Sequence, residues 1–223
     1  MFRFNFTFII LFLNLVSFLF SLSLSAAKSD PANLDKVMKN YKQADTVILD
    51  VRKTVKSEIL DKETVYKGVI RFSKGKLHWT NEEPSKSLII YDGSILWSIQ
   101  YPPAEFKSPP QVAKTKLKKG KSSPLVLTSL LGDKPLKKYF EVAPDNIDGI
   151  YQTFKLKEIK NTLGVKDILL TIDTKLDRLV KLQYIDEVEN LTKLEFRGTQ
   201  FNEVIKPTMF SFKPPKGITV QEY

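Results

Sequence analysis

The sequence predicts a mainly β protein whose chain forms one large, strongly curved antiparallel sheet or an open barrel. After a single helical segment, apolar and polar residues alternate with a period of two along about ten or eleven short stretches, which is the pattern of half-buried strands. Turn residues such as Asp92-Gly93 separate these stretches. Strands at this spacing are typical of a single antiparallel sheet that curves on itself.

The start of the chain predicts export. One arginine is the only charge before Lys28, and an apolar stretch that ends in small residues lies between them. This arrangement is the anatomy of a secretory signal. We therefore expect residues 1–27 to be a signal peptide, with cleavage after Ala27 or Ser25, and residues 28–223 to form one domain. The alternative is an uncleaved membrane anchor, because the apolar run nears the length of a spanning helix.

The composition excludes several classes of site. The chain has no cysteine, so it has no disulfide, no thiol nucleophile, no thiolate metal site and no attachment point for a bacterial lipid anchor. The formal net charge is +10. For an exported protein, this charge favours anionic lipid headgroups and acidic partners over nucleic acid.

The first element after the signal is expected to be a helix. Ser29 or Asp30 can cap it, and Pro31 suits its first turn. Its apolar residues recur at the spacing i, i+3, i+4 and i+7, which predicts one stripe that covers the sheet; they are Leu34, Val37, Met38 and Tyr41.

The period changes to two at Val47, and the next part of the chain predicts a meander of five strands. Lys74-Gly75 and Asp92-Gly93 provide two of its tight turns, and Asp-Gly between two apolar runs is a strong hairpin signal. The expected strands are 47–58, 64–73, 76–79, 87–91 and 95–101.

Residues 102–123 interrupt the β pattern with four prolines and six lysines. We expect a long exposed loop, whose charges assist encounter with a partner. The next segment, 125–131, is predicted to be a short helix that ends at Gly132. It is apolar almost all round, so it has to be buried against another part of the protein.

The second half of the chain returns to the β pattern. Pro214-Pro215 ends its last strand. The expected strands are 138–142, 151–159, 167–173, 179–185, 192–200 and the short 209–212.

We find no catalytic or metal-ligating set in the sequence. His78 is the single histidine, which leaves a His pair, a Ser-His-Asp triad and a His-based zinc site unsupported. It alternates with Leu77 and Trp79, so it faces away from them. Adjacent acidic residues lie in expected turns, and no Gly-rich phosphate loop occurs. We therefore expect a binding protein without enzyme activity and without a cofactor.

The apolar content leaves two interpretations of the interior. The chain contains two tryptophans and 15 phenylalanines. A curved sheet closed by two apolar helices encloses a space, and either side chains or a ligand fill it. The pattern of residues does not choose between a packed core and a ligand cavity.

Four motifs, in this order, resemble a known family. They are G-V-I-R-F-S-K-G-K-L-H-W at 68–79, L-I-I-Y-D-G-S-I-L-W at 88–97, S-P-L-V-L at 123–127 and F-S-F-K-P-P-K-G-I-T-V at 210–220. Each motif is modest alone, and the closing one is the most specific. The ordered set resembles the periplasmic outer-membrane lipoprotein carrier family, LolA, across the whole chain after the signal.

This resemblance implies an unclosed antiparallel barrel of about eleven strands, with helices as a lid over a hydrophobic cavity. It implies a soluble, monomeric periplasmic chaperone that binds the acyl chains of lipoproteins. Such a carrier receives lipoproteins from an inner-membrane lipoprotein-releasing transporter and delivers them to an outer-membrane receptor or membrane surface. The receptor of this fold is anchored through Cys, so the absence of Cys favours the soluble carrier.

The resemblance also implies site residues. Lys74, near a family Arg, is the expected latch of the lid, although Lys lacks the forked hydrogen bonds of Arg. The acyl-chain cavity and its lid are expected to involve Phe72, Leu77, Trp79, Ile90, Leu125, Val126 and Leu127. Three alternatives stay open: a protein of the same fold that binds or senses another lipid or a glycolipid, a periplasmic hydrolase, and a structural β protein with a packed interior.

Overall fold

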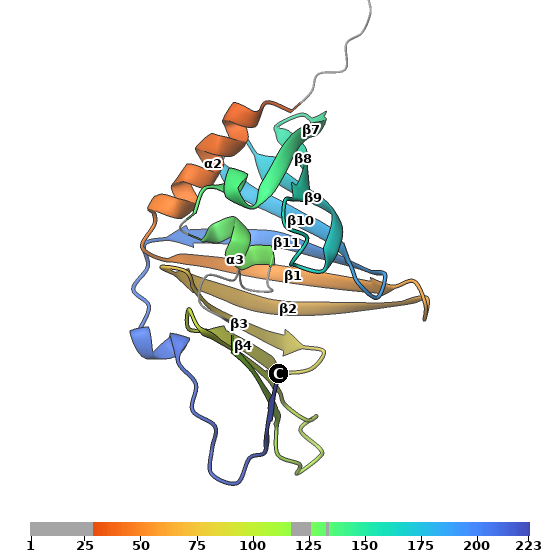
Figure 1. The fold of residues 1–223 in the computed structure, drawn as a ribbon, viewed down its shortest axis with the longest axis vertical. Coiled ribbons are helices and arrows are strands. Elements are labelled where there is room, and N and C mark those ends of the chain that lie inside the picture. The colour runs from red at the N-terminus through yellow and green to blue at the C-terminus, as the bar shows by residue number, and fades with distance from the viewer. Residues whose placement is uncertain (1–28, 117–125, 133) are drawn as a thin grey trace, which may run out of the picture.

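The computed structural model describes residues 29–116, 126–132 and 134–223. The predicted signal peptide, Leu125 and the lysines at positions 118, 119 and 121 lie outside these residues. In the described ranges, twelve strands form one sheet in the order β12-β6-β5-β4-β3-β2-β1-β11-β10-β9-β8-β7 (Figure 1). The expected mainly β architecture, an unclosed curved sheet with two helices, is confirmed.

Strands β1 to β6 and strands β7 to β11 each form a meander, and β12 returns to the other edge of the sheet, beside β6. The first strand of the first meander, β1, pairs with the last strand of the second meander, β11, and this pairing joins the two meanders into one sheet. The strands are β1 (Val47–Ser57), β2 (Lys62–Ser73), β3 (Lys76–Glu83), β4 (Ser87–Tyr91), β5 (Ile95–Gln100), β6 (Gln111–Lys116), β7 (Phe140–Asp148), β8 (Tyr151–Glu158), β9 (Val165–Asp173), β10 (Arg178–Asp186), β11 (Asn190–Phe201) and β12 (Val220–Glu222).

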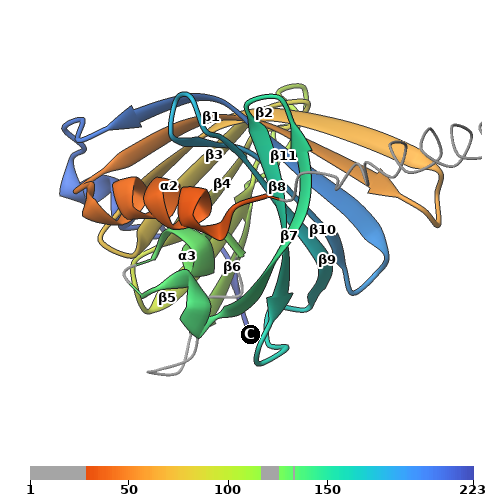
Figure 2. The same cartoon turned by 90° about the horizontal axis from the view of Figure 1, so that it is seen from above.

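Helix α2 (Pro31–Gln43) lies under the arch of the sheet (Figure 2). The side chain of Asp30 caps it by accepting a hydrogen bond from the backbone N–H of Ala32. All four residues of the predicted apolar stripe are buried, which confirms the stripe. The hydroxyl of Tyr41, in the last turn, accepts a hydrogen bond of 2.9 Å from the backbone N–H of Leu179, and this bond ties the helix to β10.

Helix α3 (Val126–Leu131) packs beside α2 on the same side of the sheet (Figure 2). All six of its residues are buried, as its apolar sequence requires. A short 3₁₀ helix, η1 (Leu136–Lys138), leads from this region into β7. In the described ranges, neither α2 nor α3 is long and apolar enough to cross a membrane.

The two faces of the sheet carry separate apolar clusters. The main cluster joins the concave face of the sheet to α2 and α3. A second cluster lies on the opposite face of β4, β5 and β6, around Ile90, Trp97, Ile99 and Val112. Residues of the C-terminal segment pack against this second cluster, including Phe212, whose ring centroid lies 5.3 Å from that of Trp97.

Three sequence-based expectations were wrong. The predicted loop 102–123 contains a strand, β6, because Val112 pairs with Ile99 and is buried in the second cluster. The predicted last strand 209–212 is not a strand: its first two residues end a 3₁₀ helix, η2 (Pro207–Phe210), and its last two have no regular structure. The last strand is β12, which pairs with β6 in parallel, so the sheet is not wholly antiparallel.

Candidate functional site

Five of the predicted cavity and lid residues lie together in the main cluster. Phe72 and Trp79 are each 4% exposed, and Leu77 is completely buried. The cross-strand pairs of Leu77 with Phe72 and with Tyr91 hold β2, β3 and β4 in one register. The remaining two, Val126 and Leu127 of α3, belong to the same cluster.

Ile90 does not belong to this group, which corrects the prediction. It pairs with His78 on β3, whereas Leu77 and Trp79 pair with Tyr91 and Ile89. Because successive side chains of a strand alternate between faces, Ile90 points to the opposite side of the sheet, where it is buried in the second cluster.

The predicted latch residue, Lys74, lies in the turn between β2 and β3. Its ammonium is 3.6 Å from a carboxylate oxygen of Asp45, which follows helix α2, and both side chains are largely exposed. An exposed pair of this kind contributes little to stability, about 0–1 kcal/mol. Its geometry links the turn to the segment after α2 rather than to α3.

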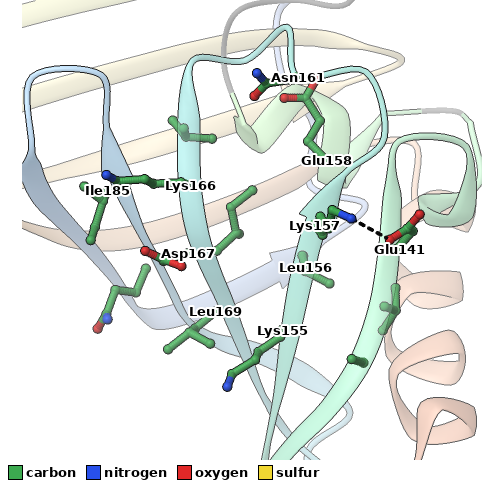
Figure 3. A pocket seen from close by; sticks show the side chains of 15 residues that line it. Glu141, Lys155, Leu156, Lys157, Glu158, Asn161, Lys166, Asp167, Leu169 and Ile185 are labelled. Atoms are coloured by element: carbon green, nitrogen blue, oxygen red, sulfur yellow. Dashed lines mark ion pairs between the residues drawn. The ribbon is translucent and has the colours of Figure 1, made fainter.

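A cavity of about 820 Å³ lies elsewhere, where strands β8 and β9 separate (Figure 3). Their ladder ends at the pair Leu156 and Ile168. Beyond it, β8 continues to Glu158 in contact with β7, and β9 begins at Val165 in contact with β10. The sheet therefore forks between β8 and β9, and we call this space the fork cavity.

Local backbone features hold the fork open. Asp167 has a positive φ of 51°, an uncommon conformation for a residue other than glycine, and the β9–β10 register shifts beside it. The carboxylate of Glu158 accepts hydrogen bonds from the backbone N–H groups of Thr162 and Leu163 and from the Thr162 hydroxyl. These bonds fold the β8–β9 loop back and bury Leu163.

The fork cavity has an apolar floor and a charged rim. Leu156 and Ile168 in its lining belong to the main cluster, so the cavity reaches the core of the protein. Further apolar lining comes from Val142, Val165, Leu169 and Ile185. The rim carries three lysines and three acidic residues: Lys155, Lys157, Lys166, Glu141, Glu158 and Asp167.

Ion pairs occupy much of this rim. Lys157 forms an ion pair with Glu141, drawn as a dashed line in Figure 3, at 3.5 Å. The ammonium of Lys166 is 2.8 Å from a carboxylate oxygen of Glu189. Because its three lysines balance its three acidic residues, the rim has no net charge, and the floor is apolar. A cavity of this volume and lining is in the range of sites for small apolar ligands, about 300–1,000 Å³.

None of the predicted site residues that the structure describes lines the fork cavity. We expected a cavity bordered by Leu77, Trp79 and 125–127, but the described residues among these are packed in the core. One signal in the sequence marks the fork. The inward apolar positions Val165 and Ile168 are three residues apart instead of two, which indicates an extra residue in the strand.

The polar residues of the described ranges offer no metal centre, since no group of three His, Asp or Glu side chains is placed to hold an ion. His78 is half-buried on the opposite face from Leu77 and Trp79, beside Arg71. Burial, assisted by the charge of Arg71, lowers the pKa of His78. The site is therefore an apolar one with a charged margin.

Comparison with known proteins shows the family to which this chain belongs. The family described as "Outer membrane lipoprotein carrier protein LolA" matches residues 43–213. An outer-membrane lipoprotein carrier protein of Nitrosospira multiformis is 30% identical over 183 residues, which cover 79% of this chain and 82% of the relative. A protein of the same name from Coxiella burnetii is 22% identical over 205 residues, which cover 91% and 92% of the two chains.

Among solved structures, a LolA superfamily protein from Nitrosomonas europaea aligns with a TM-score of 0.45 and 12% identity, over 83% of this chain and 99% of that one. The family match extends from the end of α2 to the segment after η2, and it includes every strand except β12. The chain belongs to the LolA family of outer-membrane lipoprotein carrier proteins.

Proposed function

We propose that this protein is a soluble periplasmic chaperone that binds the acyl chains of lipoproteins and carries them from the inner to the outer membrane. The observation that carries the proposal is the fork cavity, where side chains of the main cluster line a space of about 820 Å³. Membership in the lipoprotein carrier family supports the same function. The proposed partners are an inner-membrane lipoprotein-releasing transporter, and an outer-membrane receptor or the membrane surface.

The energetics explain why a carrier needs such an interior. Three acyl chains contain roughly 45 methylenes. At about 0.8 kcal/mol per buried methylene, removing them from water is favourable by on the order of 36 kcal/mol. A lipoprotein cannot cross an aqueous compartment unless a protein buries most of the apolar surface that the membrane had buried. Release then requires weakening of apolar contacts, and no covalent chemistry is involved.

Three acyl chains need more space than a pocket for one small ligand. We therefore propose that the fork cavity is the entry and that the core beneath α3 opens to extend it. Phe72, Leu77 and Trp79 of the sheet and Val126 and Leu127 of the helix would then form the walls of the loaded cavity.

Filling the fork cavity tests its role. Leu169 is half-buried and lines the cavity, so Leu169→Trp is expected to weaken binding of a fluorescent acyl probe and to slow lipoprotein transfer by about tenfold, equivalent to about 1.4 kcal/mol. Leu176→Trp is the matched control, because Leu176 is 53% exposed in the turn after β9. Equal effects of the two substitutions, with both proteins folded, would contradict the role of the cavity.

Mass spectrometry of the native protein, purified from the periplasm, identifies its cargo. A lipoprotein or its triacylated N-terminal fragment is the expected ligand. Another lipid or a glycolipid, in the absence of any lipoprotein, would overturn the carrier function in favour of a binding or sensing protein of the same fold.

A further inference from the structure

A lysine interrupts the apolar row of β1 on the concave face. The inward residues of this strand are Val47, Leu49 and Val51, all buried, and the next in the row is Lys53, which is half-buried. Its pairs across the sheet, Tyr66 on β2 and Leu194 on β11, share this face. Lys53 therefore lies where the buried part of the concave face gives way to a more accessible part.

Two aromatic rings flank the ammonium of Lys53. It lies 5.3 Å from the ring centroid of Tyr66 and 5.4 Å from that of Trp79. The indole is held in place because its Nε1–H donates to Oδ1 of Asn81 at 3.0 Å, and the amide of Asn81 donates to the hydroxyl of Ser87 at 2.9 Å. The surroundings of the charge are thus preorganised.

No anion of the described residues pairs with this ammonium through a hydrogen bond or ion pair. The acidic group that acts on it is Asp186, whose carboxylate already accepts hydrogen bonds from the backbone of Val188 and from the backbone and side chain of Asn190. Burial lowers the pKa of Lys53, and the charge of Asp186 offsets part of that effect. Aromatic rings compensate a desolvated cation only in part, so an anion from outside the chain would be favoured here.

An apolar path leads from Lys53 towards the fork cavity. Leu194 pairs with Lys53 and with Leu182, and Leu182 pairs with Leu170. Leu170 lies two residues from Ile168 on the same face, and Ile168 lines the fork cavity. The path crosses three inter-strand spacings, roughly 14 Å, which is within the reach of a long acyl chain.

We propose that Lys53, Tyr66 and Trp79 form a subsite for the negatively charged head of an acyl-chain ligand, either a carboxylate or a phosphate, whose chain extends along the concave face towards the fork cavity. This inference rests on the proposed function, because it assumes that the concave face admits acyl chains. The subsite would add a specificity that an apolar cavity alone lacks, because the ammonium of Lys53 distinguishes negatively charged heads from neutral ones.

Three probes with the same chain length test the subsite by isothermal titration: palmitate, hexadecyl phosphate and neutral monopalmitoylglycerol. We expect Lys53→Met to weaken binding of the two anionic probes by about tenfold or more and to leave the neutral probe within about twofold. Lys53→Arg should retain anion binding. Lys56→Met is the control, because Lys56 lies on the same strand, faces the opposite side and pairs with Glu58 at 3.4 Å.

The outcomes separate the subsite from the proposed function. If the neutral probe binds and Lys53→Met leaves anion binding unchanged, or weakens all three probes equally, the subsite is refuted and the carrier function stands. If the wild-type protein binds none of the three probes, the carrier function fails. Should Lys53→Met lower the melting temperature strongly, the comparison of Lys53→Gln with Lys53→Arg isolates the effect of charge.

Discussion

Truncation of Leu77 tests whether the face beneath α3 is a packed core in the protein without cargo. Leu77 is completely buried between Phe72 and Tyr91 on the neighbouring strands. Replacing a buried leucine with alanine removes apolar contacts and leaves a void, at a cost of about 2–5 kcal/mol. We therefore expect Leu77→Ala to lose a large part of the stability of a domain of this kind, about 5–15 kcal/mol.

Urea unfolding followed by circular dichroism measures this loss. The free energy of unfolding of small proteins falls by about 1–3 kcal/mol per molar urea. The midpoint of the urea unfolding curve should therefore fall by roughly 1 M or more. Leu60→Ala is the matched control, because Leu60 is 73% exposed in the turn between β1 and β2, and it should change stability by no more than about 0.5 kcal/mol.

A loss below about 1 kcal/mol for Leu77→Ala would refute this reasoning. It would mean that Leu77 already borders a void, because such a side chain has fewer contacts to lose. The sequence-based expectation of a cavity beside Leu77 would then be correct, and the core would need no opening to admit cargo.

Three further predictions concern other parts of the fold. Tyr41→Phe leaves the N–H of Leu179 without its acceptor and should cost about 1–3 kcal/mol in urea unfolding; an unchanged midpoint would contradict this. Burial raises the pKa of Tyr184 from 10.0 to about 12, so its contribution to stability is complete below pH 10.0 and is lost as the pH rises towards 12. Tyr184→Phe should therefore lose less stability than wild type across that interval, by up to about 1.4 kcal/mol per pH unit, and parallel pH curves would refute the assignment. Phe212→Ala removes the ring packed on Trp97 and should speed proteolysis of the C-terminal segment while the rest of the sheet stays protected; unaltered cleavage would show that other contacts hold the segment.

Local patterns were sufficient for most elements. The stripe of α2 follows from helical spacing alone, and both the cap at Asp30 and the buried face agree with it. Strands such as β2 and β4 were placed within a few residues because their alternation and their turns are both encoded locally. The strand β6 was missed because prolines and lysines surround it, and its burial depends on β5 and on the distant C-terminal segment.

The sequence by itself determined the class of the protein: a curved β sheet, an apolar short helix that has to be buried, and a resemblance to the lipoprotein carrier family. These features depend on composition, local periodicity and ordered motifs. The sequence could not determine which apolar residues line a cavity, since side chains that pack a core and side chains that line a pocket have the same chemistry.

The register of the strands in the tertiary structure decided which apolar residues pack in the core and which line a cavity. In the structure, Ile90 lies on the far face of the sheet and Leu77 is packed in the core. The cavity lies where the β8–β9 ladder ends at Leu156 and Ile168. The tertiary structure also places Lys53 of β1 against Trp79 of β3. Such relations join residues far apart in the chain, and one extra residue in a strand changes the face to which its side chains point.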